Sequence, residues 1–256
     1  GTGGSQEIVI DSGSFRVQVI DAGSRLNLNT ATQEQLELLP LTTEQIDAIL
    51  DWREPDLQPR FEGAKDEYYG LLDRPYLTKL RNFDTVDELL MVRGFDADLL
   101  YEPQEEVVGT ALLTAGSTDQ QVTLYEALTV DSQSSNLTPL GEPKSNVNTA
   151  SAGQLVQAGL NGQLAQAIVD RRNQVGTFTS WSQLLQVPGV TMQNVSLLLD
   201  GLTLDTTNSA QGRINLNTAS EQTLNLLPGL TPDVAQAIVA RQGTFIGLGD
   251  LAGVPG

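Results

Sequence analysis

The chain has 256 residues, of which 39% are hydrophobic, so it is long enough for about two domains with a real core. It contains no cysteine and no histidine, which excludes disulfides, thiolate metal sites and catalysis by a Ser-His or Cys-His pair. The net charge of −18 argues against binding along a nucleic-acid backbone, and no apolar run approaches the roughly 18 residues of a membrane-spanning helix.

The N-terminal segment is predicted to form a β-hairpin. Residues 7–11 and 15–20 are rich in β-branched side chains, and the second run alternates apolar and polar residues. The connection between them is short and contains Gly13, as hairpin turns require.

One short phrase follows the hairpin and occurs three times, which indicates an internal repeat. The copies begin Arg25-Leu-Asn-Leu-Asn-Thr-Ala31, Ser145-Asn-Val-Asn-Thr-Ala150 and Arg213-Ile-Asn-Leu-Asn-Thr-Ala219. Each runs on to an arginine (Arg53, Arg171, Arg241), where a cation suits the helix dipole, and each resumes at a phenylalanine (Phe83, Phe178, Phe245). About thirty residues separate these two landmarks in the first copy, against a few in the others, so the first copy carries an insertion.

The first copy predicts a small helical domain over residues 29–104. We expect Thr30 and Gln33 to form a capping box, which Thr218 and Glu221 repeat in the third copy. Two short helices with Pro40 between them should follow, then a helix capped by Asp84, a turn at Gly94 and a last helix through Leu99 and Leu100.

The pattern returns to strand from residue 105 to residue 130, most clearly over Val122–Val130. The predicted fold class is therefore α+β, with a β-layer that is discontinuous in sequence. The predicted domains are a discontinuous sheet (1–28 and 105–145), a helical insert (29–104), a second repeat (146–205) and a third repeat (213–256) that we expect to be truncated.

The repeats are similar to helix-hairpin-helix units, whose DNA-binding members offer the backbone N–H groups of a Gly-hydrophobic-Gly turn to a phosphate. The three turns are Pro40-Leu-Thr-Thr43, Gly159-Leu-Asn-Gly162 and Pro228-Gly-Leu-Thr231, and only the middle one keeps both glycines. Lysine and arginine are sparse nearby, so no nucleic-acid partner is expected. A helix-hairpin-helix DNA-binding protein, like a competence DNA receptor, is kept as the alternative function.

The insertion in the first copy is strongly acidic, which makes residues 51–69 a candidate metal loop. Calcium takes about six to eight oxygen ligands from carboxylates, carbonyls and water on a flexible loop. The candidate ligands are Asp51, Glu54, Asp56, Glu62, Asp66 and Glu67. The alternative for this loop is simple solvation, and a calcium-dependent carbohydrate or surface binder is a further hypothesis. No catalytic residues are predicted, because a glycosidase use of paired carboxylates lacks aromatic support.

Four segments of the first copy resemble the general secretion pathway protein K family, the minor pseudopilins of type II secretion. They are Asp51-Trp-Arg-Glu-Pro-Asp56, Glu62-Gly-Ala-Lys-Asp-Glu-Tyr-Tyr69, Arg74-Pro-Tyr76 and residues 82–94, and the resemblance covers about residues 7–200. It implies a pseudopilin-type antiparallel sheet interrupted by a helical insert domain, followed by helix-hairpin-helix-like repeats.

The resemblance also implies a function. Such a subunit is non-enzymatic, binds calcium in the acidic loop and sits with two other minor pseudopilins at the tip of a periplasmic pseudopilus. It lies on the periplasmic side of the bacterial inner membrane, held only by an N-terminal anchor helix that this chain lacks. By position, Glu54, Asp56 and Asp66 match acidic positions of the loop, whereas Lys65 replaces an acid.

Overall fold

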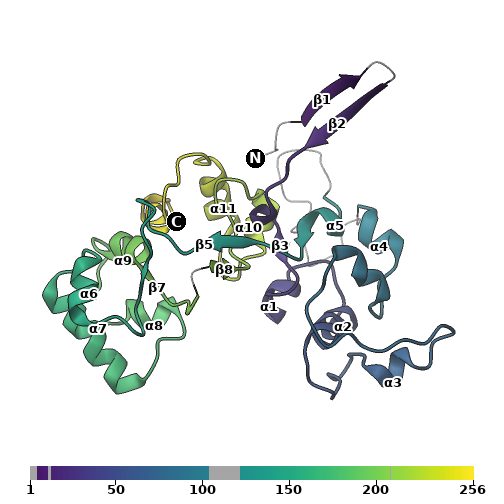
Figure 1. Ribbon diagram of the computed structural model, residues 1–256, viewed down its shortest axis with the longest axis horizontal. Helices are drawn as coiled ribbons and strands as arrows, with labels where there is room; N and C mark the ends of the chain where they lie inside the picture. Colours follow the sequence, from purple (N-terminus) through teal and green to yellow (C-terminus); the bar gives the residue numbers. More distant parts are fainter. Residues whose placement is uncertain (1–4, 11–12, 104–121, 208) are drawn as a thin grey trace. The chain divides into compact units, whose positions relative to one another are not determined.

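The computed structural model describes residues 5–10, 13–103, 122–207 and 209–256, and it combines helices with short strands (Figure 1). A mixed fold class is thereby confirmed. The chain divides into two compact units, residues 1–133 with 211–242 and residues 134–210 with 243–256. These units group the residues differently from the predicted domains, because the third repeat contributes to both.

The N-terminal hairpin is confirmed. Strand β1 (Ser5–Ile10) pairs antiparallel with β2 (Gly13–Gln18), and Ser5 lies opposite Gln18 at the open end (Figure 1). The side chains of Val9 and Phe15 are exposed.

The repeated Asn-x-Asn-Thr-Ala phrase folds into the same turn in all three copies. The Oδ1 atom of the first asparagine accepts a hydrogen bond from the backbone N–H of the second, an Asx turn that asparagine favours. The N···O distances are 2.8 Å for Asn27 and Asn29, 2.7 Å for Asn146 and Asn148, and 3.0 Å for Asn215 and Asn217. The N–H groups of the threonine and the alanine then return to the carbonyl of that first asparagine in each copy.

This turn displaces the start of each helix. Helix α1 (Gln33–Leu36) begins after Thr32, α6 (Ala152–Gln157) after Ser151 and α10 (Glu221–Asn225) after Ser220. The predicted capping boxes of Thr30 with Gln33 and of Thr218 with Glu221 are therefore wrong by two residues. Thr32 forms the box with Gln35, and Ser220 accepts from the Thr223 N–H.

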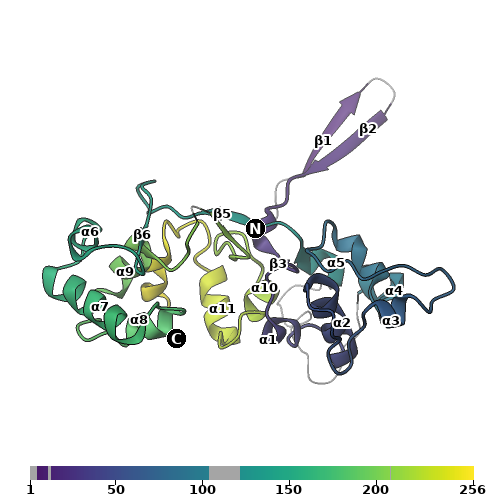
Figure 2. The same cartoon turned by 60° about the horizontal axis from the view of Figure 1, so that its bottom comes forward.

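A second helix follows each of these short helices. Pro40 separates α1 from α2 (Thr43–Arg53), as predicted. The corresponding helices are α7 (Gly162–Val175), which contacts α6, and α11 (Pro232–Val239), which contacts α10 (Figure 2).

The end of the second helix is tied back to the start of its own repeat. The Arg53 guanidinium donates to the carbonyls of Leu28 and Ala31. Arg172 makes the same contacts with Val147 and Ala150, at 2.8 and 2.9 Å, and the Gln242 amide with Leu216 and Ala219, at 3.2 and 2.5 Å.

Among the arginines that the repeat pattern singled out, Arg53 makes this contact, and in the other two copies the residue next along the chain makes it. The residue that binds the carbonyls lies four after a buried isoleucine, as Arg53 follows Ile49. The same spacing from Ile168 and Ile238 gives Arg172 and Gln242, which make this contact in the second and third copies.

A second contact holds the phenylalanine at which the first and second repeats resume. The Asn29 side chain donates to the Phe83 carbonyl at 3.0 Å and accepts from the Phe83 N–H at 2.7 Å. Asn148 and Phe178 repeat this pair at 2.9 and 2.7 Å. One asparagine side chain thus pairs both backbone groups of a residue far along the chain.

The strands between the repeats are short. Strand β3 (Leu26–Asn27) runs parallel to β4 (Leu128–Thr129), β6 (Ser145–Asn146) runs parallel to β7 (Leu202–Thr203), and β5 (Gln133–Ser135) pairs with β8 (Ser209–Gln211). The predicted antiparallel sheet interrupted by a helical insert is not confirmed, and residues 104–121 of its second part lie outside the described residues.

The strand predicted over Val122–Val130 is wrong. Residues Leu124–Ala127 form α5, and only Leu128–Thr129 are strand. Thr123 and Glu126 make a complete capping box, and Leu124 and Ala127 are buried, so local capping and packing outweigh the β-rich composition.

Each unit has its own apolar core. The first gathers residues from the whole helical domain and from the third repeat, including Trp52, Tyr69, Leu89, Leu100 and Leu226. The second is built on Val147, Leu155, Ile168, Phe178 and Leu198.

The remaining helices are η1 (Ala22–Ser24), α3 (Asp66–Tyr69), η2 (Val86–Met91), α4 (Ala97–Tyr101), α8 (Trp181–Leu185), α9 (Val195–Gly201) and η3 (Leu248–Gly253). Across the part of the chain that the structure describes, none of the helices is long and apolar enough to cross a membrane.

The paired asparagine contact predicts a measurable loss of stability. Asn148→Ala should lower the free energy of unfolding by about 2 kcal/mol, because both backbone groups of Phe178 lose their partner. Urea unfolding followed through Trp181 fluorescence measures the change. Thr149→Ala, whose side chain is exposed, is the control, and equal midpoints for the two variants would contradict the assignment.

Candidate functional site

The long insertion of the first copy lies between α2 and η2 and carries α3 (Figure 1). An aromatic cluster holds it on the helices: Trp52 and Tyr69 meet edge to face with centroids 5.2 Å apart, and Tyr76 stacks on Tyr69 at 5.2 Å. The Leu80 N–H donates to the Trp52 carbonyl at 2.9 Å, which fixes the far end of the loop. Burial raises the pKa of Tyr69 to about 12, so this hydroxyl stays protonated.

The first two predicted ligands are bound to an arginine of the same loop. Asp51, which is 1% exposed, accepts from the Arg60 N–H at 3.1 and 3.3 Å. The Arg60 guanidinium binds both Glu54 oxygens at 2.7 and 3.2 Å, a bidentate pair. Burial raises the pKa of Asp51 although Arg60 and Lys65 oppose it. A Cβ on Gly63 would lie 1.9 Å from the Asp51 Oδ2 atom, so the chain needs glycine there.

Lys65 occupies the inside of the loop. Its side chain is only 4% exposed, and its Nζ atom donates to the carbonyls of Asp51 at 2.5 Å and Glu54 at 3.1 Å. Burial lowers the pKa of Lys65, while the carboxylates of Asp51, Glu54 and Asp56 act in the opposite direction. The loop therefore encloses a cation that belongs to the chain.

The other predicted ligands do not share a partner. Asp56 accepts from the Gln58 N–H at 2.9 Å and Asp66 from the Thr78 N–H at 2.7 Å, whereas Glu62 and Glu67 are exposed. Throughout the described residues, no three acidic side chains form a group that could hold a metal ion. Calcium binding by Asp51, Glu54, Asp56, Glu62, Asp66 and Glu67 stays a prediction.

Two residues of this site were not predicted from the sequence. Asp47 is buried and accepts from the Glu62 N–H at 3.1 Å, which binds the loop to α2. Its spacing of four from Asp51 places both carboxylates on one face of the helix, and this signal could have found it. Arg60 is the second, and no spacing pointed to its pairing.

Beside the loop, Glu88 joins three partners. Its carboxylate accepts from the Trp52 indole N–H at 3.1 Å, from Lys79 at 2.6 Å and from the Asp84 N–H at 2.9 Å. Asp84 was predicted as an N-cap, which is wrong: η2 begins after Thr85, and the Asp84 side chain instead binds Lys79. The predicted turn at Gly94 (φ +82°) and the helix through Leu99 and Leu100 are confirmed.

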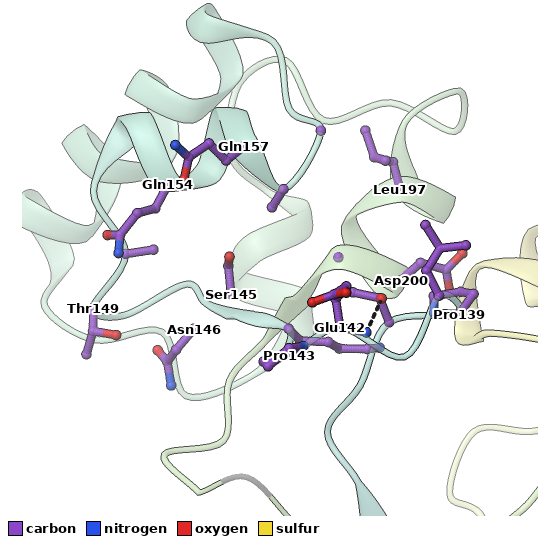
Figure 3. A pocket seen from close by; sticks show the side chains of 17 residues that line it. Pro139, Glu142, Pro143, Ser145, Asn146, Thr149, Gln154, Gln157, Leu197 and Asp200 are labelled. Carbon is purple, nitrogen blue, oxygen red and sulfur yellow. Dashed lines mark hydrogen bonds between the residues drawn. The ribbon is translucent and has the colours of Figure 1, made fainter.

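The second unit holds a cleft of about 910 Å³ near α6 and α9 (Figure 3). Two of the charged residues that line it are bound to the backbone: Lys144 donates to the Leu199 carbonyl at 2.6 Å, and Asp200 accepts from the Gly249 N–H at 2.8 Å. Glu142 and Gln154 add exposed polar groups, and these residues do not make a nucleophile with a base.

The hairpin turns differ in the N–H groups that they leave for a phosphate. In the first turn the Thr42 N–H donates to the Gln45 side chain at 2.8 Å. The third turn is followed directly by Pro232, which has no backbone N–H to donate. In the middle turn the Asn161 side chain takes the Leu164 N–H, and the space around Gly162 is open. The middle turn thus keeps both glycines of the motif, Gly159 and Gly162.

Two family models match the chain. The model for the type II secretion system protein K matches residues 24–103, and the helix-hairpin-helix motif matches residues 142–202 and 209–256. Residues 24–103 are thus similar to protein K. The resemblance to the protein K family, with a further helix-hairpin-helix-like repeat at the C-terminal end, is thereby confirmed.

Individual curated relatives are similar to part of the chain. The type II secretion system protein K of Klebsiella pneumoniae is 30% identical over 115 residues, which are 37% of this chain and 35% of that protein. The endonuclease/exonuclease/phosphatase family domain-containing protein 1 of Mus musculus is 31% identical over 173 residues, 65% of this chain. This chain spans only 26% of that protein's length.

A solved structure is also similar. It is the GspK-GspI-GspJ complex of the type 2 secretion system from enterotoxigenic Escherichia coli, with a TM-score of 0.35 and 15% identity. The match covers 79% of this chain and 70% of the solved chain.

The Glu88 contacts predict a pH-dependent stability. Burial by itself raises the pKa of Glu88, but hydrogen bonds from Lys79, the Asp84 N–H and Trp52 outweigh it and lower the pKa below its ordinary 4.5. A lowered carboxyl pKa stabilises the folded state above pH 4.5, and this contribution is lost as the pH falls through the lower folded value.

Glu88→Gln should therefore lower the free energy of unfolding by about 1–3 kcal/mol at neutral pH, and the difference should shrink below pH 4.5. Trp52 fluorescence in a Trp181→Phe background follows the unfolding of the unit that contains Glu88. A difference that is constant down to pH 3 would refute the linkage.

Proposed function

We propose that this chain is a non-enzymatic structural subunit of a type II secretion system, a minor pseudopilin at the tip of the pseudopilus that supports protein export. The observation that carries the proposal is the match of residues 24–103 to protein K, in the domain whose core includes Trp52 and Tyr69. Its partners are then the other minor pseudopilins of the same system.

The location follows from the same proposal. A pseudopilus tip lies on the periplasmic side of the bacterial inner membrane, and an anchor helix holds such a subunit there. The acidic surface that a net charge of −18 provides keeps this chain soluble and suits basic partner surfaces. Calcium stabilisation of the helical domain would complete the family pattern. In this loop, however, the Lys65 ammonium already binds two backbone carbonyls, which supports lysine as the cation of the loop.

Assembly is the direct test. The chain should form a stable complex with the I- and J-type minor pseudopilins of its own secretion system when the three are mixed. Size-exclusion chromatography with light scattering gives the mass and the stoichiometry. An unrelated protein of similar size and charge serves as the control, and separate elution of the chain at all concentrations would refute the proposal.

The second candidate is duplex DNA binding, which the two glycines of the middle turn, the open space around Gly162 and the helix-hairpin-helix match favour. The charge of −18 opposes it. We expect no gel shift of duplex DNA at low salt. A shift that weakens with salt and disappears in Gly162→Asp, but persists in Gly153→Asp, would establish this function instead.

A further inference from the structure

The acidic loop of the first copy is built around a positive charge, which is the arrangement that calcium would otherwise complete. Calcium would require several carboxylate and carbonyl oxygens directed to one point. Two carbonyls do converge, those of Asp51 and Glu54, and both accept from the Lys65 ammonium. The two carbonyl oxygens that could bind a metal ion inside the loop are therefore already bound by a lysine of the chain.

The carboxylates are used in the same way. Arg60 binds both oxygens of Glu54 with its guanidinium and contacts Asp51 with its backbone N–H, so neither acid faces the interior of the loop unpaired. Asp66 is directed to the Thr78 N–H. A calcium ion would have to displace a buried ammonium and separate a bidentate ion pair, so the residues do not fit this ion.

We propose that the Lys65 ammonium, supported by the Arg60 guanidinium, replaces the metal ion and makes the closure of this loop independent of calcium. The burial of Lys65 supports this role, since a buried lysine requires paired acceptors and here has two carbonyls. Closure of the loop is tested separately from the assembly proposed above, because the melting temperature is measured on the chain without partners.

The first arm of the test uses the unchanged loop. Trp52 fluorescence in a Trp181→Phe background gives the melting temperature in EDTA, in calcium and in magnesium. We expect the three values to agree within about 1 °C, since a calcium site at a hundredfold excess over its Kd would raise the value by roughly 5–10 °C. A calcium-specific rise of that size would overturn the proposal.

The second arm removes the ammonium. Lys65→Met should lower the Trp52 melting temperature by about 5 °C or more, because two carbonyls lose a charged donor. Lys144→Met is the matched control: it removes a lysine that donates to a backbone carbonyl in the other unit.

The comparison between the two variants decides the role of Lys65. Equal melting temperatures for Lys65→Met and Lys144→Met would overturn the proposal. If Lys65→Met does not fold while Lys144→Met does, Lys65→Met has lost more stability than the control. Lys65→Arg, which keeps a cation, should then recover folding. If Lys65→Arg also fails while the calcium arm shows a rise, the loop depends on metal.

Discussion

A side chain at the end of one helix, bound to two backbone carbonyls at the start of its own repeat, is the contact on which the architecture depends. Arg53, Arg172 and Gln242 perform it in the three copies. The carbonyls that they bind belong to the Asx turn, so the helix end and the turn fix each other. Without this contact the asparagine would not be positioned to pair with the phenylalanine that follows, as Asn29 does with Phe83. One local phrase therefore binds both the end of a helix and a residue far along the chain, and the insertion of the first copy lies between these two contacts.

The insertion illustrates how charge composition can suggest a ligand that contacts do not support. Six acids within a short stretch repel one another unless a cation is present, which is why the sequence favours a metal. The two cations that matter, Arg60 and Lys65, lie in the same stretch, and from the sequence Lys65 is noted only as a replaced acid. Their positions in space depend on the fold of α2 and on the aromatic packing around Tyr69, neither of which the order of charges reveals.

Features with a local cause could be predicted from the sequence. The N-terminal hairpin, the break at Pro40 and the turn at Gly94 each depend on the conformational limits of one or two residues, and the structure has all three. Features decided by competition between neighbours could not. Thr30 is a good cap by type, but the Asx turn before it claims its backbone, so Thr32 caps the helix. The acidic site required knowledge of which carbonyls converge, and that is a property of the folded loop alone.

The division of the third repeat has a consequence for synthesis on the ribosome. Leu226 belongs to the core of the first unit, and residues 243–256 belong to the second. Neither unit is a continuous stretch of chain, so the helical domain at the N-terminal end remains incomplete while more than a hundred further residues are translated. The first unit is complete only when the chain has been made as far as residue 242, and a continuous fragment that contains it whole also contains most of the second unit.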